Sequence, residues 1–333
     1  CIVSFNKVLV IRLSSIGDIV LTSPVLRSIK NQTNAKIDFL TKEKYAHVIK
    51  NNPHVQNVFT INEIVDNFKK KDYDLIIDLQ KNFKSFFLSL LLKKRFSTKY
   101  VSYNKKNIKK WVLINFKKNF IEKEHLIDRY FYQLGKYNIQ NDYEGLDYFI
   151  PSSISIKSFS KKLPFQKNFF AWILGGTYEY KKLSKNQIEN VCSKISAPIF
   201  FLGGDLEKET GNEICKNLNK PNVYNLCGKL SLDESAYVLK NASIVLTNDT
   251  GLMHIAAAFK KIIISFWGCT KPSLGMYPYK PHPKSIQLVT KSSVFPCSKL
   301  GNKCRQDEKG CINKISSEDI LAAIKKVGYN SKC

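Results

Sequence analysis

Residues 243–258, which read SIVLTNDTGLMHIAAA, carry side chains suited to chemistry on a phosphorylated ligand. An apolar strand should end at the turn over residues 248–251, and a helix should follow. We expect Asp249 to cap this helix, because its carboxylate can accept hydrogen bonds from the first amides. The unpaired amides and the helix dipole would also favour a bound phosphate. Thr250 and His254 lie one helical turn apart and should share a face.

Short glycine-containing loops follow three other predicted strands. They read Ile16-Gly17-Asp18, Gly175-Gly176-Thr177 and Gly203-Gly204. None of them matches the dinucleotide-binding fingerprint or a P-loop. Together with the turn at Asp249, three of the four loops fall in the second half of the chain. We therefore expect the nucleotide end of a substrate to bind the second half, with Asp18 facing it from the first half.

Strand and helix patterns alternate along both halves of the chain. Apolar strands are expected at residues 7–13, 35–40, 57–61, 73–79, 98–102, 168–174, 198–202 and 261–266. Such alternation favours parallel sheets with helices on both faces. The helical pattern over residues 19–30 contains Pro24, so the helix either begins at Ser23 or bends there. Two doubly wound halves would place ligands at the carboxyl ends of their strands, in the crevice between the halves.

The domain boundaries follow from where this alternation lapses. The 333-residue chain is long enough for two domains. Residues 138–167 lack periodicity and are interpreted as a linker. We expect Rossmann-like domains over residues 1–155 and 156–315. The remaining segment, residues 316–333, should form a helix capped by Ser316 or Ser317, with the option of packing back on the N-terminal domain.

The chain is strongly basic, with 53 Lys and Arg against 27 Asp and Glu and a formal net charge of +26. This excess predicts an anionic partner, although the abundance of Lys, Asn and Ile would also follow from an AT-rich genome. Residues 81–120 hold twelve Lys or Arg and no acidic residue, interleaved with aromatics. Such a block is typical of a solvated surface, of contact with anionic lipid, or of a nucleic-acid groove. No segment resembles a signal peptide or a membrane span.

Two segments resemble the signature regions of glycosyltransferase family 9, the bacterial heptosyltransferases that build the lipopolysaccharide inner core from ADP-heptose. They are residues 8–30, VLVIRLSSIGDIVLTSPVLRSIK, and residues 248–272, NDTGLMHIAAAFKKIIISFWGCTKP. Residues 76–85 and 181–184 extend the likeness, which covers most of the chain in order. The resemblance implies an α/β fold of the GT-B type, inversion at the anomeric carbon, and no tightly held metal or cofactor. Residues 1–155 would then bind the acceptor and residues 156–315 the nucleotide sugar.

The resemblance also implies roles for single residues. Asp18 would be the general base that takes the proton from the acceptor hydroxyl, the alternative being that it only caps the following helix. Lys181, or its neighbour Lys182, would meet the diphosphate and offset charge on the leaving group. The implied donor-binding residues are Gly176, Thr177, Lys181, Glu207, Leu230, Asp249, Thr250, Gly251 and His254. The implied acceptor-side residues are Arg12, Gly17, Asp78 and Gln80.

For several of these residues a structural role remains an alternative. His254 would be either a ligand contact or a buried core histidine. Asp78 and Gln80 could equally belong to a strand end with a capping carboxylate. The chain also departs from the family, which often has tryptophan and proline where Leu183 and Ser184 stand, and proline where Cys269 stands. Those changes leave the donor sugar open more than the reaction class.

Three cysteines, Cys297, Cys304 and Cys311, recur at intervals of seven residues. A zinc ion would require four ligands, usually with close pairs, and His282 is remote in sequence as a fourth. A cytosolic setting disfavours a stable disulfide. We therefore expect no metal at these cysteines.

The sequence as a whole predicts an inverting glycosyltransferase that moves a heptose, or a related sugar, from ADP-heptose to a lipid-A-core acceptor. The enzyme would be cytoplasmic and peripheral at the inner membrane, with an anionic lipid surface as partner. One alternative is a transferase of the same fold with another nucleotide-sugar donor, in O-chain or capsule assembly. A remote alternative is a basic nucleic-acid-binding protein, for which no recognition motif is present.

Overall fold

The computed structural model describes residues 5–66, 72–92, 98–121, 124–155, 168–291 and 295–329. The chain forms two compact units. The first unit comprises Cys1–Lys106 and Glu124–Phe149, and the second comprises Asn107–Lys123 and Ile150–Cys333. We expected one boundary at residue 155, whereas the segment Asn107–Lys123 also clusters with the second unit. Of the expected linker, residues 138–155 hold neither helix nor strand, and residues 156–167 lie outside the described residues.

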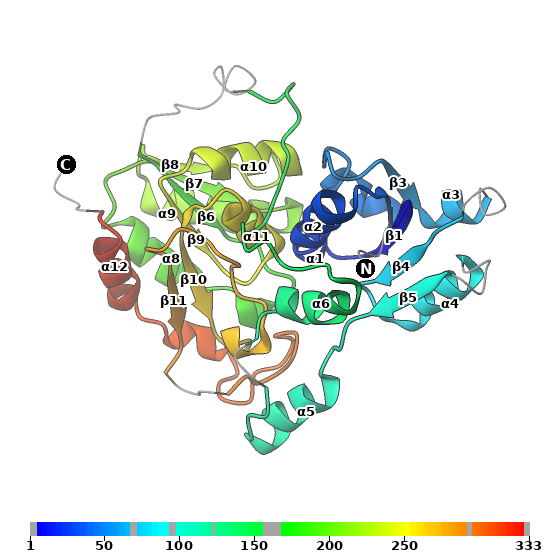
Figure 1. The fold of residues 1–333 in the computed structure, drawn as a ribbon. Helices are drawn as coiled ribbons and strands as arrows, with labels where there is room; N and C mark the ends of the chain where they lie inside the picture. Colours follow the sequence, from blue (N-terminus) through cyan, green and yellow to red (C-terminus); the bar gives the residue numbers. More distant parts are fainter. Residues whose placement is uncertain are drawn as a thin grey trace. The chain divides into compact units, whose positions relative to one another are not determined.

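The first unit is built on a parallel sheet with the strand order β3-β2-β1-β4-β5 (Figure 1). Its strands are β1 (Lys7–Ile11), β2 (Lys36–Thr41), β3 (Asn57–Thr60), β4 (Leu75–Asp78) and β5 (Lys99–Ser102). The two central strands β1 and β4 are buried almost throughout, as expected for a sheet covered on both faces.

The helices of the first unit connect these parallel strands. They are α1 (Ile16–Val20), α2 (Ser23–Thr33), η1 (Glu43–Val48), α3 (Ile61–Asp66), α4 (Phe83–Leu92), α6 (Leu126–Leu134) and η3 (Gly135–Tyr137). The helical pattern over residues 19–30 is divided between α1 and α2. Thr22 is the N-cap of α2 and Pro24 lies in its first turn, where the missing amide costs no hydrogen bond. The helix therefore begins near Ser23 and does not bend at the proline.

The second unit contains a six-stranded parallel sheet with the order β11-β10-β9-β6-β7-β8. Its strands are β6 (Phe170–Ile173), β7 (Ile199–Leu202), β8 (Val223–Asn225), β9 (Ile244–Thr247), β10 (Ile262–Trp267) and β11 (Ile286–Val289). The sequence did not predict β8 and β11, which are the two edges of this sheet. Both sheets are doubly wound, and this part of the predicted fold class is confirmed.

The second unit contains both α-helices and short 3-10 turns. The helices are α5 (Asn107–Phe116), α8 (Lys185–Cys192), α9 (Lys208–Leu218), α10 (Leu232–Asn241), α11 (Gly251–Ala258) and α12 (Ser317–Lys326). Short 3-10 turns are η4 (Glu179–Lys181), η5 (Asp205–Glu207), η6 (Pro272–Leu274) and η7 (Cys311–Lys314). Among the described residues, no helix has the length and apolar composition to cross a bilayer.

The last helix, α12, packs on α8 and β11 of its own unit. Ile320 and Ile324 on α12 join the core that Phe170 of β6 also lines. The side chain of Gln187 on α8 reinforces this packing by donating to the carbonyl oxygen of Ile315 at 2.6 Å. The apolar face of α12 is therefore buried in the core of the second unit.

In each sheet the strand order reverses direction at one point. The chain starts at a central strand, builds outward to one edge, and returns to build the other side from the centre. The reversal lies between β1 and β4 in the first unit and between β6 and β9 in the second. Two crossovers leave in opposite directions there, so the carboxyl ends of these strand pairs are open to ligands.

Candidate active site

Most side chains predicted for the site lie on loops that leave these two reversal points. In the first unit, Arg12 follows β1 and Gln80 follows β4, and the two strands are neighbours. In the second unit, Gly175 follows β6 and Asn248 follows β9, which are also neighbours. Ligands of open α/β sheets bind outside the carboxyl ends of strands at such points.

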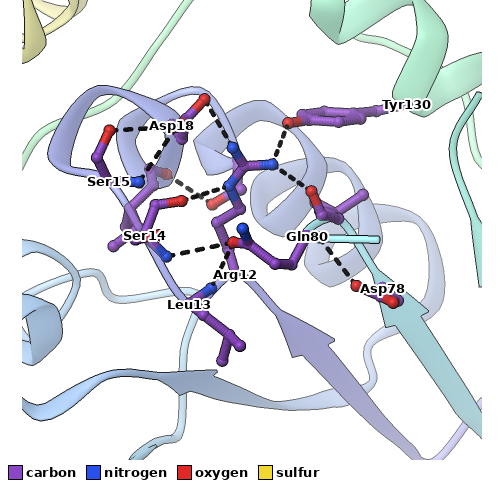
Figure 2. Close-up of polar contacts among 11 residues, drawn as sticks. Arg12, Leu13, Ser14, Ser15, Asp18, Asp78, Gln80 and Tyr130 are labelled. Atoms are coloured by element: carbon purple, nitrogen blue, oxygen red, sulfur yellow. Dashed lines mark hydrogen bonds and ion pairs between the residues drawn. The ribbon is translucent and has the colours of Figure 1, made fainter. Parts of the chain in front are cut away.

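Asp18, at the third position of α1, is held by two residues that precede it (Figure 2). Its Oδ1 forms an ion pair with Nη2 of Arg12 at 2.7 Å. Its Oδ2 accepts hydrogen bonds from the backbone amide of Ser15 at 3.1 Å and from the Ser15 hydroxyl at 3.2 Å. Asp18 thus does cap α1, as the alternative interpretation held. Its side chain is nevertheless 22% exposed.

Arg12 is buried and donates hydrogen bonds to backbone carbonyl oxygens of the neighbouring loops. Its Nε donates to the carbonyl oxygen of Ser14 at 2.9 Å, and its Nη1 donates to the carbonyl oxygen of Leu79 and to the hydroxyl of Tyr130. Burial alone would lower the pKa of the guanidinium, but the adjacent Asp18 carboxylate raises it above its ordinary value. Arg12 was expected to point at an acceptor, whereas the structure pairs it with Asp18 and fixes the position of that carboxylate.

The loop after β4 braces the loop after β1. Oε1 of Gln80 accepts hydrogen bonds from the backbone amides of Leu13 at 3.0 Å and Ser14 at 3.3 Å (Figure 2). Asp78 is fully buried and accepts from the amides of Gln80 and Lys81 at 2.9 and 2.7 Å. In this structure Asp78 is a capping carboxylate at a strand end, and Gln80 acts on the conformation of the Asp18 loop.

Two more donors complete the environment of Asp78. The hydroxyls of Ser85 and Tyr100 donate to its Oδ2 at 2.8 and 3.1 Å. Burial, together with the negative charge of Asp78, raises the pKa of Tyr100 to about 12. The phenol therefore remains a neutral donor at physiological pH, and the carboxylate is fully satisfied.

On the donor side, Lys181 and Asp249 form an ion pair between the loops after β6 and β9. The Lys181 Nζ lies 2.7 Å from Oδ2 of Asp249, and both side chains are mostly buried. The same Oδ2 accepts a hydrogen bond from the hydroxyl of Thr270, beyond β10, at 3.3 Å. The pair places one cation and one carboxylate together at the carboxyl end of the sheet.

A second ion pair joins Lys182 to Glu207 beside the glycine loops. The Lys182 Nζ lies 3.2 Å from Oε1 of Glu207 and 2.8 Å from Oε1 of Glu179. Burial alone would lower the pKa of Lys182, but hydrogen bonds to these two carboxylates raise it. Glu207 also accepts from the amide of Gly204 at 3.0 Å. A Cβ on Gly203 would come within 2.8 Å of the Glu207 Cβ, so this loop requires a glycine to approach the side chain.

The turn before α11 differs from the expectation in one detail. Thr250 is the N-cap of α11, not Asp249, because the Asp249 carboxylate is turned to Lys181 and Thr270. The Thr250 side chain makes no capping hydrogen bond. Its Oγ1 and the Oδ1 of Asn248 are both buried without a hydrogen-bond partner among the described residues. Orphaned polar atoms beside the free amides of a helix suit a polar ligand.

The sequence model of glycosyltransferase family 9 (heptosyltransferase) matches residues 61–305, most of the chain. The chain belongs to glycosyltransferase family 9. This family 9 chain is 25% identical to lipopolysaccharide heptosyltransferase 1 of Campylobacter coli, over 96% of this chain and 98% of that protein.

Two solved structures share its fold. A family 9 glycosyl transferase of Veillonella parvula has a TM-score of 0.80 at 18% identity, with 98% of each chain covered. The Escherichia coli ADP-heptose lipopolysaccharide heptosyltransferase II has a TM-score of 0.72 at 17% identity, with 96% of this chain and 98% of that chain covered. These likenesses confirm the predicted GT-B fold class of family 9 with its two Rossmann-like domains.

The remaining residues predicted from the family 9 resemblance have diverse environments. Gly17 is buried within α1, and His254 is buried on α11 with 3% of its surface exposed. Thr177 is exposed in the loop after β6, and Leu230 is half-buried just before α10. The structure thus brings Gly176, Thr177, Lys181, Glu207, Asp249, Thr250 and Gly251 to the carboxyl ends of β6, β7 and β9.

Sequence reasoning missed four side chains that lie on these loops or contact them. Asn248 had a visible signal, because a polar residue at the end of an apolar strand is unusual inside a core. Ser15 also had one, since a serine three residues before an acidic residue is a helix-start pattern. Thr270 and Tyr130 gave no signal, because each reaches its partner only through the tertiary fold.

Proposed function

We propose that this family 9 enzyme transfers a heptose from ADP-heptose to a lipopolysaccharide inner-core acceptor, with inversion at the anomeric carbon. The names of its relatives support the donor and the acceptor class, since they are lipopolysaccharide and ADP-heptose heptosyltransferases. The observation that carries the proposal is the Asp18 carboxylate, which is ion-paired to buried Arg12 and yet partly open to solvent.

In the proposed reaction Asp18 accepts the proton of the acceptor hydroxyl as that oxygen attacks the anomeric carbon. The new bond between the oxygen and the sugar forms while the bond from the anomeric carbon to the diphosphate breaks, so ADP leaves with the electron pair. One carboxylate on the acceptor side is sufficient for inversion, and no enzyme nucleophile is required. The ion pair with Arg12 favours the ionised carboxylate, which is the form a base needs.

The second unit would hold the nucleotide sugar. The free amides at the start of α11 and the Lys181 ammonium suit the diphosphate, and the Asp249 carboxylate suits a sugar hydroxyl. Charge that develops on the departing ADP would be stabilised by Lys181 and by the helix dipole. Glu207, on η5 after β7, would accept a hydrogen bond from a ribose hydroxyl.

We also propose that the enzyme works at the cytoplasmic face of the inner membrane as a peripheral protein. Helix α4 exposes large apolar side chains: Phe83, Phe86, Phe87, Leu90 and Leu91. Helix α5 and the residues after it expose Ile108, Trp111, Phe116 and Phe120, with Lys109, Lys117 and Lys118 between them. Exposed aromatics among lysines fit an anionic lipid surface, where rings insert and lysines meet headgroups.

The role of Asp18 is tested by replacing it with asparagine. We expect Asp18→Asn to lower kcat by about 10²- to 10⁴-fold, the usual contribution of a general base, with ADP binding unchanged. Formation of the heptosylated acceptor and release of ADP would be measured together. Asp142→Asn is the matched control, because Asp142 is also an arginine-paired carboxylate of the first unit. Turnover of Asp18→Asn at the wild-type rate would contradict the proposed base.

A panel of nucleotide sugars distinguishes ADP-heptose from the alternative donors. Each compound is added to the wild-type chain, and the midpoint of thermal unfolding is recorded. A ligand present at about 100 times its Kd should add about 2.7 kcal/mol to the free energy of unfolding. ADP-heptose should give the largest shift, and a larger shift with a UDP-sugar would favour the other donor.

A further inference from the structure

Four cysteine side chains converge beside the donor loops of the second unit. The Sγ atoms of Cys269, Cys297, Cys304 and Cys311 all lie within 4.8 Å of one another. The Cys269–Cys311 and Cys297–Cys304 sulfur distances are 3.5 and 4.0 Å. Four sulfurs bound to one zinc ion at about 2.3 Å would stand about 3.8 Å apart, so the cluster has tetrahedral dimensions. A disulfide requires sulfurs at about 2.05 Å, and all four thiols are free.

The fourth cysteine of the cluster, Cys269, is not one that the sequence pattern indicated. Cys269 follows β10, whereas Cys297, Cys304 and Cys311 belong to the segment leading into η7. His282, considered as a fourth ligand, is not part of the cluster. The backbone supports the convergence, since the Cys297 amide donates to the Cys269 carbonyl oxygen at 2.8 Å and the Cys311 amide donates to Sγ of Cys304 at 3.3 Å. Amides that donate to sulfur are typical of metal-bound thiolates, whose charge they help to stabilise.

The segment that carries these cysteines lacks an apolar core of its own. Residues 298–310 read SKLGNKCRQDEKG and form neither helix nor strand. The one large aliphatic side chain in that stretch, Leu300, is 50% exposed. Cys269 and Cys311 are in contrast fully buried, and Cys297 is nearly so. A polar segment without an apolar core of its own is the kind of structure that a metal ion stabilises.

A buried cation accompanies the thiols. Lys271, two residues beyond Cys269, is buried with 2% of its surface exposed. Its one described hydrogen bond, to the carbonyl oxygen of Thr290, is long at 3.4 Å. Four thiolates around a divalent ion carry a net charge of about −2, and a nearby buried ammonium would offset part of it.

We propose that Cys269, Cys297, Cys304 and Cys311 bind a single tetrahedrally coordinated metal ion, zinc or iron, that holds residues 295–311 in place. Thiolate-only tetrahedral sites select these metals. With four protein ligands the ion has no open position for substrate or water, so its role is structural and it takes no part in the chemical step.

The cysteine segment contacts the donor loop, which gives the metal a consequence for the site. Gly301 has φ +75°, and a Cβ there would come within 2.7 Å of Cγ of Lys181. Tyr180, the neighbour of Lys181, packs against the cysteine cluster. Thr270, the neighbour of Cys269, donates to Asp249. Residues on both sides of the Lys181–Asp249 ion pair are thus attached to the proposed metal site.

The same segment also holds α5. Arg305 donates to the carbonyl oxygen of Ile114 at 3.1 Å and to Oδ1 of Asn115 at 2.9 Å. Lys299 donates to Oδ1 of Asn107 at 2.9 Å. An ordered cysteine segment therefore fixes both the donor lysine and the helix that carries exposed Trp111.

Metal analysis of the full chain tests the proposal. The protein is produced with zinc or with iron in the medium, and its metal content is measured by mass spectrometry. We expect about one metal ion per chain in the wild type and at least about a tenfold loss in Cys304→Ser. Cys215→Ser is the matched control, since Cys215 is a half-buried cysteine of α9 outside the cluster. Whichever metal is retained through dialysis against a weak chelator identifies the ion.

Cobalt spectroscopy covers the case in which Cys304→Ser fails to fold. Stripped wild-type protein titrated with Co²⁺ should develop the visible absorption bands of tetrahedral thiolate coordination, with an endpoint of about one ion per chain. These measurements need no donor or acceptor, so they remain valid if the proposed sugar transfer is wrong. Metal content below about 0.1 per chain in both media without cobalt bands would overturn the site, as would full metal content in folded Cys304→Ser.

Discussion

At the scale of single residues, each unit has one carboxylate–cation pair among its candidate site residues. Arg12 holds Asp18 in the first unit, and Lys181 holds Asp249 in the second. The two pairs differ in what surrounds the cation. Arg12 is buried and bonded to loop carbonyls, so it is a fixed positioning group. Lys181 has a flexible stem and one acidic partner in the described structure, so a diphosphate can compete for it.

Opposite effects are expected from the two members of the donor pair. Lys181→Met should weaken ADP binding by about 10- to 100-fold, because a charge-assisted contact with phosphate contributes about 1.5–3 kcal/mol. Asp249→Asn should leave ADP binding unchanged or strengthen it, since the competing carboxylate is gone, while kcat/KM for the nucleotide sugar falls. Isothermal titration with ADP measures the first effect and steady-state kinetics the second.

A nearby lysine provides the control for this pair. Lys185 is exposed and pairs with the exposed Glu213, so Lys185→Met should bind ADP like the wild type. If Lys181→Met also bound ADP with wild-type affinity, Lys181 would not be the group that meets the diphosphate.

At the scale of elements, helix α2 secures the segment that closes the first unit. Residues 138–149 form no helix or strand, so their backbone depends on side chains from elsewhere. Arg27 of α2 binds Asp142 through two parallel contacts of 2.7 and 2.8 Å, and it also binds Asp147 and the carbonyl oxygen of Gly145. Gln32 of the same helix exchanges two hydrogen bonds with the backbone of residue 140.

The stability that Asp142 provides should depend on pH in a defined direction. The hydrogen bonds from Arg27 hold the pKa of the Asp142 carboxyl below its ordinary value of 3.8. A carboxylate with a lowered pKa in the folded state stabilises the fold above its unfolded pKa, and that contribution disappears as the pH falls through the folded value. Asp142 is partly exposed, so solvent screening limits the effect at neutral pH to about 1 kcal/mol.

We therefore expect Asp142→Asn to lower the free energy of unfolding by about 1 kcal/mol at pH 7 and by progressively less below about pH 4. Urea unfolding of both proteins at several pH values would measure the difference. Glu43→Gln, at an exposed carboxylate of η1, should show no such pattern. A difference that stayed constant down to pH 3 would assign the effect to packing and not to charge.

At the scale of the whole molecule, part of the net charge of +26 is carried by the basic block over residues 81–120. The basic block over residues 81–120 is divided between the two units, with α4 in the first and α5 in the second. Both helices expose aromatic rings, and residues 93–97 between them lie outside the described residues. The block therefore includes two helices with exposed apolar side chains, one on each unit.

Vesicle binding tests the membrane proposal for the whole protein. The wild type should bind vesicles that contain anionic lipid at low salt and should dissociate as salt rises, because lysine–headgroup attraction is screened. Replacing Phe83, Phe87, Trp111 and Phe116 with serine should weaken binding at least about tenfold, since buried ring area is lost. Tyr132→Ser removes an exposed aromatic from α6 and should have no effect. Equal binding to neutral vesicles, or none at low salt, would contradict the proposal.

Sequence patterns predicted every strand of the first sheet and the four inner strands of the second. Strands such as β1 and β6 are buried on both faces and read as continuous apolar runs. The two strands that were missed, β8 and β11, are sheet edges, and β11 alternates half-buried with exposed residues over only four positions. Short edge strands obtain their conformation from the neighbouring strand, so their own sequence carries little signal.

The amino-acid sequence by itself determined the alternation of strands and helices, the glycine loops and the family signature, because these depend on residues close together along the chain. Tertiary structure alone decided which side chains meet. It turned Arg12 onto Asp18, gave Asp249 to Lys181 in place of the N-cap, and added Cys269 to three distant cysteines. Each of these contacts depends on which strands lie side by side in a sheet or on how a long loop folds back. Local patterns cannot encode those choices, since strand order and loop path follow from burying both sheets at once.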